Sequence, residues 1–186
     1  SALASLFLML TIGDTLFCWP QKSDRQFLTP IVASLGFALS PFIIIWSRTA
    51  VSDALLTGTL GISLLLFWRR MASKKNDQCI SAWLFLGFAI LTKGPVAFVL
   101  AFLTITSFLF SQKNWKMLLS KINPKKGFLI TILISVPWYI LELLKEGKPF
   151  WDNFFGYHNF QRYTSVVNNH AEPFWFFLYI MILASL

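Results

Sequence analysis

The sequence predicts an all-α protein: a polytopic transmembrane helix bundle with an amphipathic helix at the outer membrane interface. Of the 186 residues, 56% are hydrophobic and only 13% are charged, whereas about a quarter of the residues in soluble domains are charged. The apolar residues form runs that are too long and too closely spaced for the helices of a soluble domain. The net charge of +8 comes from Lys and Arg that lie mostly between these runs. We interpret this charge as a membrane orientation signal and expect no nucleic-acid partner.

Each apolar run is a candidate spanning helix, because about 20 apolar residues cross a bilayer. Two of the runs are short and form a hairpin with Lys93 at its outer tip. At about 1.5 Å per residue, the first arm of this hairpin extends about 18 Å, which is less than the roughly 30 Å of a hydrocarbon core. We therefore expect Lys93 to lie below the outer interface and to be met by an anionic group. The expected spans are residues 2–19, 27–46, 51–68, 80–91, 95–110 and 127–144, and a last run that begins at residue 173.

The orientation of these spans follows from the basic residues, since Lys and Arg in short loops mark the cytoplasmic side. Most of the 16 Lys and Arg fall in three loops that alternate with outer segments. The expected cytoplasmic loops are 20–26, 69–79 and 111–126, and the expected outer segments are Ser1, 47–50 and 145–172.

An amphipathic helix is expected over residues 150–163, within the last outer segment. Phe150 and Phe154 are four residues apart, and so are His158 and Arg162. Aromatic side chains suit the membrane interface, so this helix is expected to lie in the outer interface. It is either a lipid-facing aromatic belt with a solvated polar face, or an element that turns His158 and Arg162 toward a buried site.

Five polar residues map to the predicted outer face: Arg48, Asp53, Lys93, His158 and Arg162. Four of them can be cationic and one is acidic, which suits a bound phosphate with a carboxylate nearby. A structural interpretation remains open for each of them. Arg48 can be an interfacial anchor, Asp53 an acid favoured by a helix dipole, and Lys93 a lysine that reaches toward the headgroups.

Three further residues are expected to have no role in chemistry. Asp14 lies in an apolar run, where we expect a helix-end carboxylate that reaches water or a basic partner. Cys18 and Cys79 have no ligand-like neighbours in the sequence, so we expect two free thiols and no metal site.

Four short motifs, taken together, resemble those of a known enzyme family. They are Ser-Arg-Thr-Ala-Val-Ser-Asp at 47–53, Leu-Thr-Lys-Gly-Pro at 91–95, Pro-Trp-Tyr at 137–139 and His-Asn-Phe-Gln-Arg-Tyr at 158–163. In this order they resemble the polyprenyl-phosphate-sugar-dependent membrane glycosyltransferases of the GT-C type. The bacterial aminoarabinose transferases and the protein O-mannosyltransferase-like enzymes are the most similar group. The resemblance covers roughly residues 30–186.

The resemblance implies sugar transfer from a polyprenyl-phosphate donor on the periplasmic face of the bacterial inner membrane. The acceptor would be lipid A, another glycolipid or a protein. Lys93 and Arg162 would contact the donor phosphate, and Asp53 would be the family's second acid, which supports the acceptor or a metal ion. Arg48 and His158 would be neighbours of that site. The resemblance leaves the cofactor unknown, with a divalent metal ion still open.

The resemblance also implies that residues 1–186 are part of a larger transmembrane glycosyltransferase domain. We expect the family's first span and first outer loop, which carries the general base, and its C-terminal spans to lie outside this chain. The piece alone is therefore expected to be inactive. Two other functions remain open: a transporter or flippase of lipid-linked sugars, and a structural membrane subunit without a site. The charges gather at one face and no internal repeat is visible, whereas transporters often show repeats and midplane sites.

Overall fold

A computed structural model describes residues 2–17, 28–48, 52–72, 79–152, 154 and 175–185. All of the regular structure in these residues is helical, which confirms the all-α class. The chain divides into two compact units, Ser1–Ile134 and Ser135–Leu186. The division falls within helix α8 (Pro124–Glu146).

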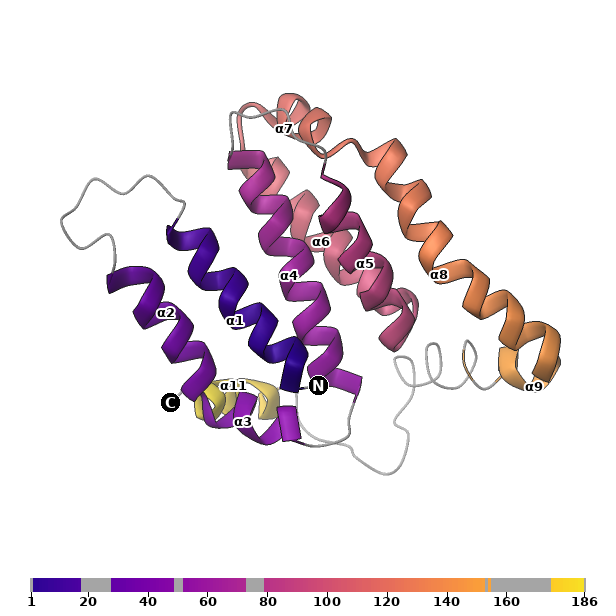
Figure 1. Cartoon of the computed structure of the whole chain (residues 1–186), viewed down its shortest axis with the longest axis horizontal. Helices are drawn as coiled ribbons and strands as arrows, with labels where there is room; N and C mark the ends of the chain where they lie inside the picture. The colour runs from indigo at the N-terminus through magenta and orange to yellow at the C-terminus, as the bar shows by residue number, and fades with distance from the viewer. Residues whose placement is uncertain are drawn as a thin grey trace. The chain divides into compact units, whose positions relative to one another are not determined.

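The first unit is built from helices packed side by side. Figure 1 shows α4 between α1 and α5, with α7 across one end of α4 to α6. Its helices are α1 (Ala2–Phe17), α2 (Leu28–Leu39), α3 (Pro41–Arg48), α4 (Ser52–Ala72), α5 (Ile80–Lys93), α6 (Pro95–Ser111), α7 (Trp115–Ile122) and the first part of α8.

The core of this unit lies between α4, α5, α6 and α7. Phe67 is fully buried, and its ring packs edge-on against Trp83 with the centroids 4.8 Å apart. Two glycines let α8 approach α5 closely. A Cβ on Gly127 would lie 1.9 Å from Trp83 Cε2, and one on Gly87 would lie 3.0 Å from Ile134 Cβ. Small residues that permit such close approach are typical of helices packed in membranes.

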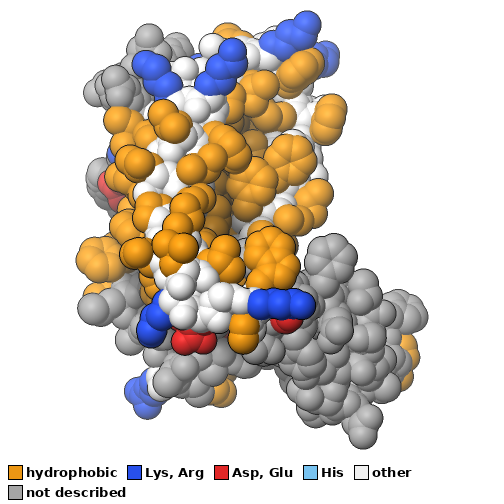
Figure 2. Space-filling view, turned by 90° about the vertical axis from the view of Figure 1, so that its right-hand side faces the viewer, with side chains coloured by type: hydrophobic (Ala, Val, Ile, Leu, Met, Phe, Trp, Pro, Cys, Tyr) orange, Lys and Arg blue, Asp and Glu red, His pale blue; other side chains and the backbone are white. Residues whose placement is uncertain are grey.

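Large apolar side chains also cover the outside of the first unit. Phe110 is 87% exposed and Leu133 is 73% exposed, and Figure 2 shows hydrophobic side chains over much of one face. Among the described residues, α8 is the one helix that is long and apolar enough to cross a membrane. Four other apolar helical segments are shorter: residues 5–15, 28–39, 80–93 and 95–111. The bundle of several spans therefore stays a prediction.

The expected single helix over 27–46 is wrong, because the structure has two helices there. α2 ends at Leu39 and α3 begins at Pro41. The proline ring disfavours helical backbone at the preceding residue, Ser40, and proline has no N–H for the helix ladder. The Ser40 carbonyl accepts from the Ile44 N–H at 3.1 Å and so starts the new helix.

The expected loop at 111–126 is wrong in part, because it contains α7. Leu118, Leu119 and Ile122 of this helix pack against the core. Asn123 then ends α7 with a left-handed backbone of φ 48° and ψ 62°, a conformation that asparagine tolerates. The hairpin expected at 80–91 and 95–110 is confirmed as α5 and α6.

The second unit contains the end of α8, α9 (Lys148–Phe150) and α11 (Phe176–Ser185). Aromatic rings join α8 to the segment that follows it. Trp138 lies edge-on to Phe150, with centroids 6.2 Å apart, and Phe150 stacks on Phe154 at 5.3 Å. This stacking fits the four-residue spacing noted above. The remainder of the expected helix over 150–163 lies outside the described residues.

Candidate functional site

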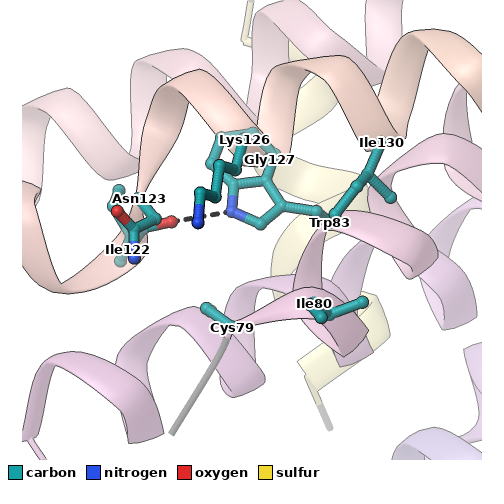
Figure 3. Close-up of a pocket in the computed structure, with 8 residues that line it drawn as sticks. All are labelled: Cys79, Ile80, Trp83, Ile122, Asn123, Lys126, Gly127 and Ile130. Atoms are coloured by element: carbon teal, nitrogen blue, oxygen red, sulfur yellow. Dashed lines mark hydrogen bonds between the residues drawn. The ribbon is translucent and has the colours of Figure 1, made fainter. Parts of the chain in front are cut away.

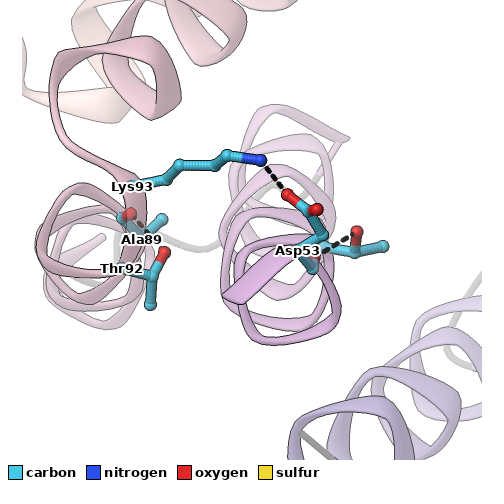
Figure 4. A network of polar contacts seen from close by, with 5 residues as sticks. Asp53, Ala89, Thr92 and Lys93 are labelled. Atoms are coloured by element: carbon cyan, nitrogen blue, oxygen red, sulfur yellow. Dashed lines mark hydrogen bonds and ion pairs between the residues drawn. The ribbon is translucent and has the colours of Figure 1, made fainter. Parts of the chain in front are cut away.

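Asp53 and Lys93 form an ion pair between two helices of the first unit. Asp53 is in the first turn of α4, and Lys93 is the last residue of α5. The Lys93 ammonium donates to Asp53 Oδ1 across the 40 residues that separate them in the sequence. Figure 4 shows the lysine side chain reaching from α5 to the carboxylate on α4. The expectation that an anionic group meets Lys93 is therefore confirmed.

Local sequence places both charges at the helix ends that favour them. A carboxylate is stabilised near a helix N-terminus and an ammonium near a C-terminus. α5 stops at Gly94, whose N–H bonds to the Ile90 carbonyl at 2.7 Å. Gly94 has φ 78° and ψ −154°, a combination that essentially only glycine adopts. Pro95 then occupies the first turn of α6, where its missing N–H costs nothing.

The ion pair is accessible to a ligand. The Lys93 and Asp53 side chains are 37% and 40% exposed. The hydroxyls beside them bond within their own helices. Thr57 Oγ1 donates to the Asp53 carbonyl at 2.8 Å, and Thr92 Oγ1 donates to the Ala89 carbonyl at 2.7 Å. As far as the described residues show, an incoming anion can thus compete with Asp53 for the lysine without disturbing the hydrogen bonds of these two threonines.

Of the other three candidate residues, the structure describes Arg48 alone. Arg48 is exposed in the last turn of α3. Among the residues that the structure describes, no hydrogen bond or ion pair joins it to Asp53 or Lys93. His158 and Arg162 lie outside the described residues. The described part of the chain also holds no group of three or more His, Cys, Asp or Glu suited to a metal ion.

A second polar network lies at the other end of α4, and sequence reasoning found only part of it. Asp14 pairs with Arg69, which confirms the expected helix-end carboxylate with a basic partner. Arg70 Nε donates to the Lys121 carbonyl at 3.2 Å, and Lys121 Nζ donates to the Met71 carbonyl at 2.9 Å. In the sequence, Arg70 and Lys121 indicate only the orientation of the chain in the membrane. Their nearness to the ends of apolar runs was the signal for a structural role, because helix ends carry unsatisfied carbonyls.

Two cavities lie away from the Asp53–Lys93 pair. One of about 60 Å³ adjoins Trp83, whose Nε1 donates to the Ile122 carbonyl at 2.8 Å (Figure 3). Cys79 lines it, and burial raises the pKa of this thiol to about 11 against a smaller opposing effect of Arg70. This pKa makes the thiol unreactive at neutral pH. The other cavity, of about 520 Å³, is an open and largely apolar groove lined by residues of α1 and α2.

The sequence matches a known protein family and several curated proteins. Residues 26–141 match the family described as dolichyl-phosphate-mannose-protein mannosyltransferase. The chain is 28% identical to the undecaprenyl phosphate-alpha-4-amino-4-deoxy-L-arabinose arabinosyl transferase 2 of Pseudomonas fluorescens, over 98% of this chain and 32% of the relative. It is 26% identical to the corresponding arabinosyl transferase of Erwinia tasmaniensis, with the same coverage. A protein of Aquifex aeolicus is 31% identical over 84% of this chain and 34% of its own length.

The chain spans about a third of the length of the curated relatives that it matches. No solved structure matches it. Both motifs that meet in the ion pair, residues 47–53 and 91–95, fall within the matched residues.

Proposed function

The chain belongs to the dolichyl-phosphate-mannose-protein mannosyltransferase family, and we propose that it is part of a polytopic membrane glycosyltransferase. The full-length protein would transfer a sugar from a polyprenyl-phosphate donor to a lipid A-like glycolipid or to a protein. Transfer would take place on the periplasmic face of the bacterial inner membrane. The names of the relatives support the donor class, because each arabinosyl transferase is named for an undecaprenyl phosphate-linked sugar.

One observation carries the assignment to a site: the ion pair of Lys93 and Asp53, which joins two family-like motifs at one end of the first unit. An ammonium and a carboxylate side by side, both partly open to solvent, can serve the two halves of a transfer reaction. The bond between the sugar and the phosphate breaks, and the departing phosphate needs a cation. The acceptor hydroxyl loses its proton to a general base, and a second carboxylate nearby can accept its hydrogen bond and orient it.

Lys93 is proposed to hold the donor phosphate together with Arg162. The polyprenyl tail stays in lipid, so the phosphate must be met at headgroup depth, where the short helix α5 would end. A lysine supplies a compact charge, while an arginine can grip phosphate with two parallel hydrogen bonds.

Asp53 is proposed to support the acceptor once the donor phosphate has replaced it as the partner of Lys93. In the structure its carboxylate is occupied by the lysine, and donor binding would release it toward the acceptor hydroxyl or toward a divalent metal ion. The general base itself is proposed to lie outside residues 1–186, because the chain spans only about a third of the length of its relatives. Arg48 and His158 are proposed as neighbours of the site.

Donor binding by the full-length protein in lipid nanodiscs tests the role of Lys93. We expect Lys93→Ala to weaken binding of an undecaprenyl-phosphate sugar by tenfold or more, since a hydrogen bond to a charged group contributes about 1.5–3 kcal/mol. The matched control is Arg69→Ala, which breaks the ion pair with Asp14, another pair between helices of the first unit. We expect that variant to bind the donor as the wild type does.

Two outcomes would contradict the proposal. Equal donor affinity in Lys93→Ala and wild type would remove Lys93 from the phosphate site. Equal weakening in both variants would mean that the loss reflects damage to the helix bundle rather than a missing ligand contact.

A further inference from the structure

We propose that the exposed face of α7, with the lysines that flank it, binds the headgroups of anionic phospholipids at the membrane surface. We call this region the α7 surface and define it as Phe110, Lys113, Trp115, Lys116, Met117, Lys125 and Lys126. It lies at the end of α4 away from the Asp53–Lys93 pair (Figure 1). The inference requires residence in a membrane and is independent of the sugar-transfer chemistry.

α7 is fixed to the bundle by its inner face. Ile122 is only 2% exposed, and its carbonyl accepts from Trp83 Nε1 at 2.8 Å. Lys121 turns back to the Met71 carbonyl, and Arg70 donates to the Lys121 carbonyl. Bonds in both directions between α4 and α7 therefore hold the helix in place, and the opposite face stays available.

The available face mixes apolar and basic side chains. Trp115 is 44% exposed and Met117 is 54% exposed. Lys116 Nζ lies 5.5 Å from the centroid of the Trp115 ring, a cation–π contact. Phe110, at the end of α6, is 87% exposed. Tryptophan beside lysine is typical of the headgroup depth of a bilayer, where the ring is buried and the ammonium meets phosphate.

The charge of this region has one sign. Residues 110–134 contain five lysines and no Asp or Glu, and four of these lysines are exposed. Figure 2 shows Lys and Arg gathered at the upper end of the face in view, above the hydrophobic side chains. Clusters of four or more basic residues on an amphipathic helix bind anionic lipids. The apolar members of the α7 surface favour a lipid over free phosphate, because a free ion would leave them in water.

Native mass spectrometry of the purified full-length protein tests the proposal, with phosphatidylglycerol or phosphatidylcholine added in increasing amounts. We expect phosphatidylglycerol to bind more tightly than phosphatidylcholine. The double variant Lys116→Gln/Lys125→Gln should weaken phosphatidylglycerol binding more than tenfold, since each lysine near an anionic surface contributes about fivefold. The matched control is Lys145→Gln/Lys148→Gln, which removes two exposed lysines of the second unit and should change binding less than twofold.

A second measurement places the surface relative to the bilayer. A spin label on Met117→Cys, in nanodiscs that contain phosphatidylglycerol, should be more accessible to oxygen than to a water-soluble nickel complex. Equal loss of lipid in both double variants would overturn the proposal, as would equal affinity for the two lipids. A label at position 117 that is fully water-accessible, as expected if the surface docks a soluble protein partner, would also overturn it. Sugar transfer by the Lys116→Gln/Lys125→Gln variant is measured alongside, so that loss of lipid binding is not confused with loss of the active site.

Discussion

The two ends of α4 carry similar ion pairs in different surroundings. At one end Arg69 meets Asp14, and at the other Asp53 meets Lys93. Each pair joins residues on different helices, 55 positions apart for Arg69 and Asp14 and 40 for Asp53 and Lys93, and each is partly exposed. At the Arg69 end, further bonds and a buried tryptophan tie α4, α5 and α7 together. At the Asp53 end, the neighbouring threonines bond only within their own helices. An ion pair alone therefore does not mark a site. Among the described residues, the two ends differ in whether other bonds also hold the helices.

The largest expected effect is on turnover at the Asp53 end. In the full-length protein, Asp53→Asn should lower sugar transfer by about 100-fold or more, the scale of a lost proton-transfer or acceptor-orienting group. Donor binding should stay unchanged or become tighter, because the carboxylate no longer competes with the phosphate for Lys93. Asp14→Asn serves as the control and should leave turnover within about threefold of wild type. A loss of both donor binding and turnover in Asp53→Asn would instead indicate a structural role.

The next effect concerns stability at the Arg69 end. Gly127→Ala should lower the stability of the folded protein by about 2 kcal/mol or more, because the new Cβ would overlap the buried Trp83 ring. Thermal unfolding in detergent measures the change. Gly36→Ala is the control, since no atom lies within 4 Å of its added Cβ, and helix propensity favours alanine. If Gly127→Ala unfolds at the wild-type temperature, the close packing of α8 on α5 is not as the structure has it.

The smallest expected effect is on stability, at a hydrogen bond between the two ends of α4. Ser63 is fully buried in α4, and its Oγ donates to the Ala82 carbonyl of α5 at 2.8 Å. Ser63→Ala should cost about 0.6 kcal/mol, the average for a hydrogen bond between membrane helices, with turnover unchanged. The exposed Ser81→Ala is its control in the same unfolding assay. A change in turnover of Ser63→Ala would show that the two ends of α4 are coupled.

The helix positions could be predicted from the sequence where apolar runs had clear limits. Gly94 and Pro95 predicted the turn of the hairpin, and the anion expected beside Lys93 is present as Asp53. The break at Pro41 was missed because hydropathy continues across it, although the proline itself carried the signal. α7 was missed because it is only eight residues long, three of them are polar or charged, and only one face packs against the core.

The partners of the charged residues could not be predicted. An anion beside Lys93 was expected from its predicted depth, whereas the choice of Asp53 depends on α4 and α5 lying side by side with a particular rotation. Arg69 and Asp14 are separated by 55 residues, and nothing in either segment specifies the other. Such pairing is set by the packing of Gly61 against Leu8 and similar contacts, which are properties of shape rather than of sequence pattern.

The pairing of Lys93 with Asp53 also bears on how the protein is made. If the Asp53 end lies on the outer side, as proposed, the α5–α6 hairpin would have to carry Lys93 through the hydrocarbon during insertion, where a lone ammonium is costly. Synthesis runs from the N-terminus, so Asp53 emerges from the ribosome 40 residues before Lys93. On this topology, the carboxylate would be available to the lysine from the start. The order of the two residues along the chain would then let the acid enter the membrane before the base.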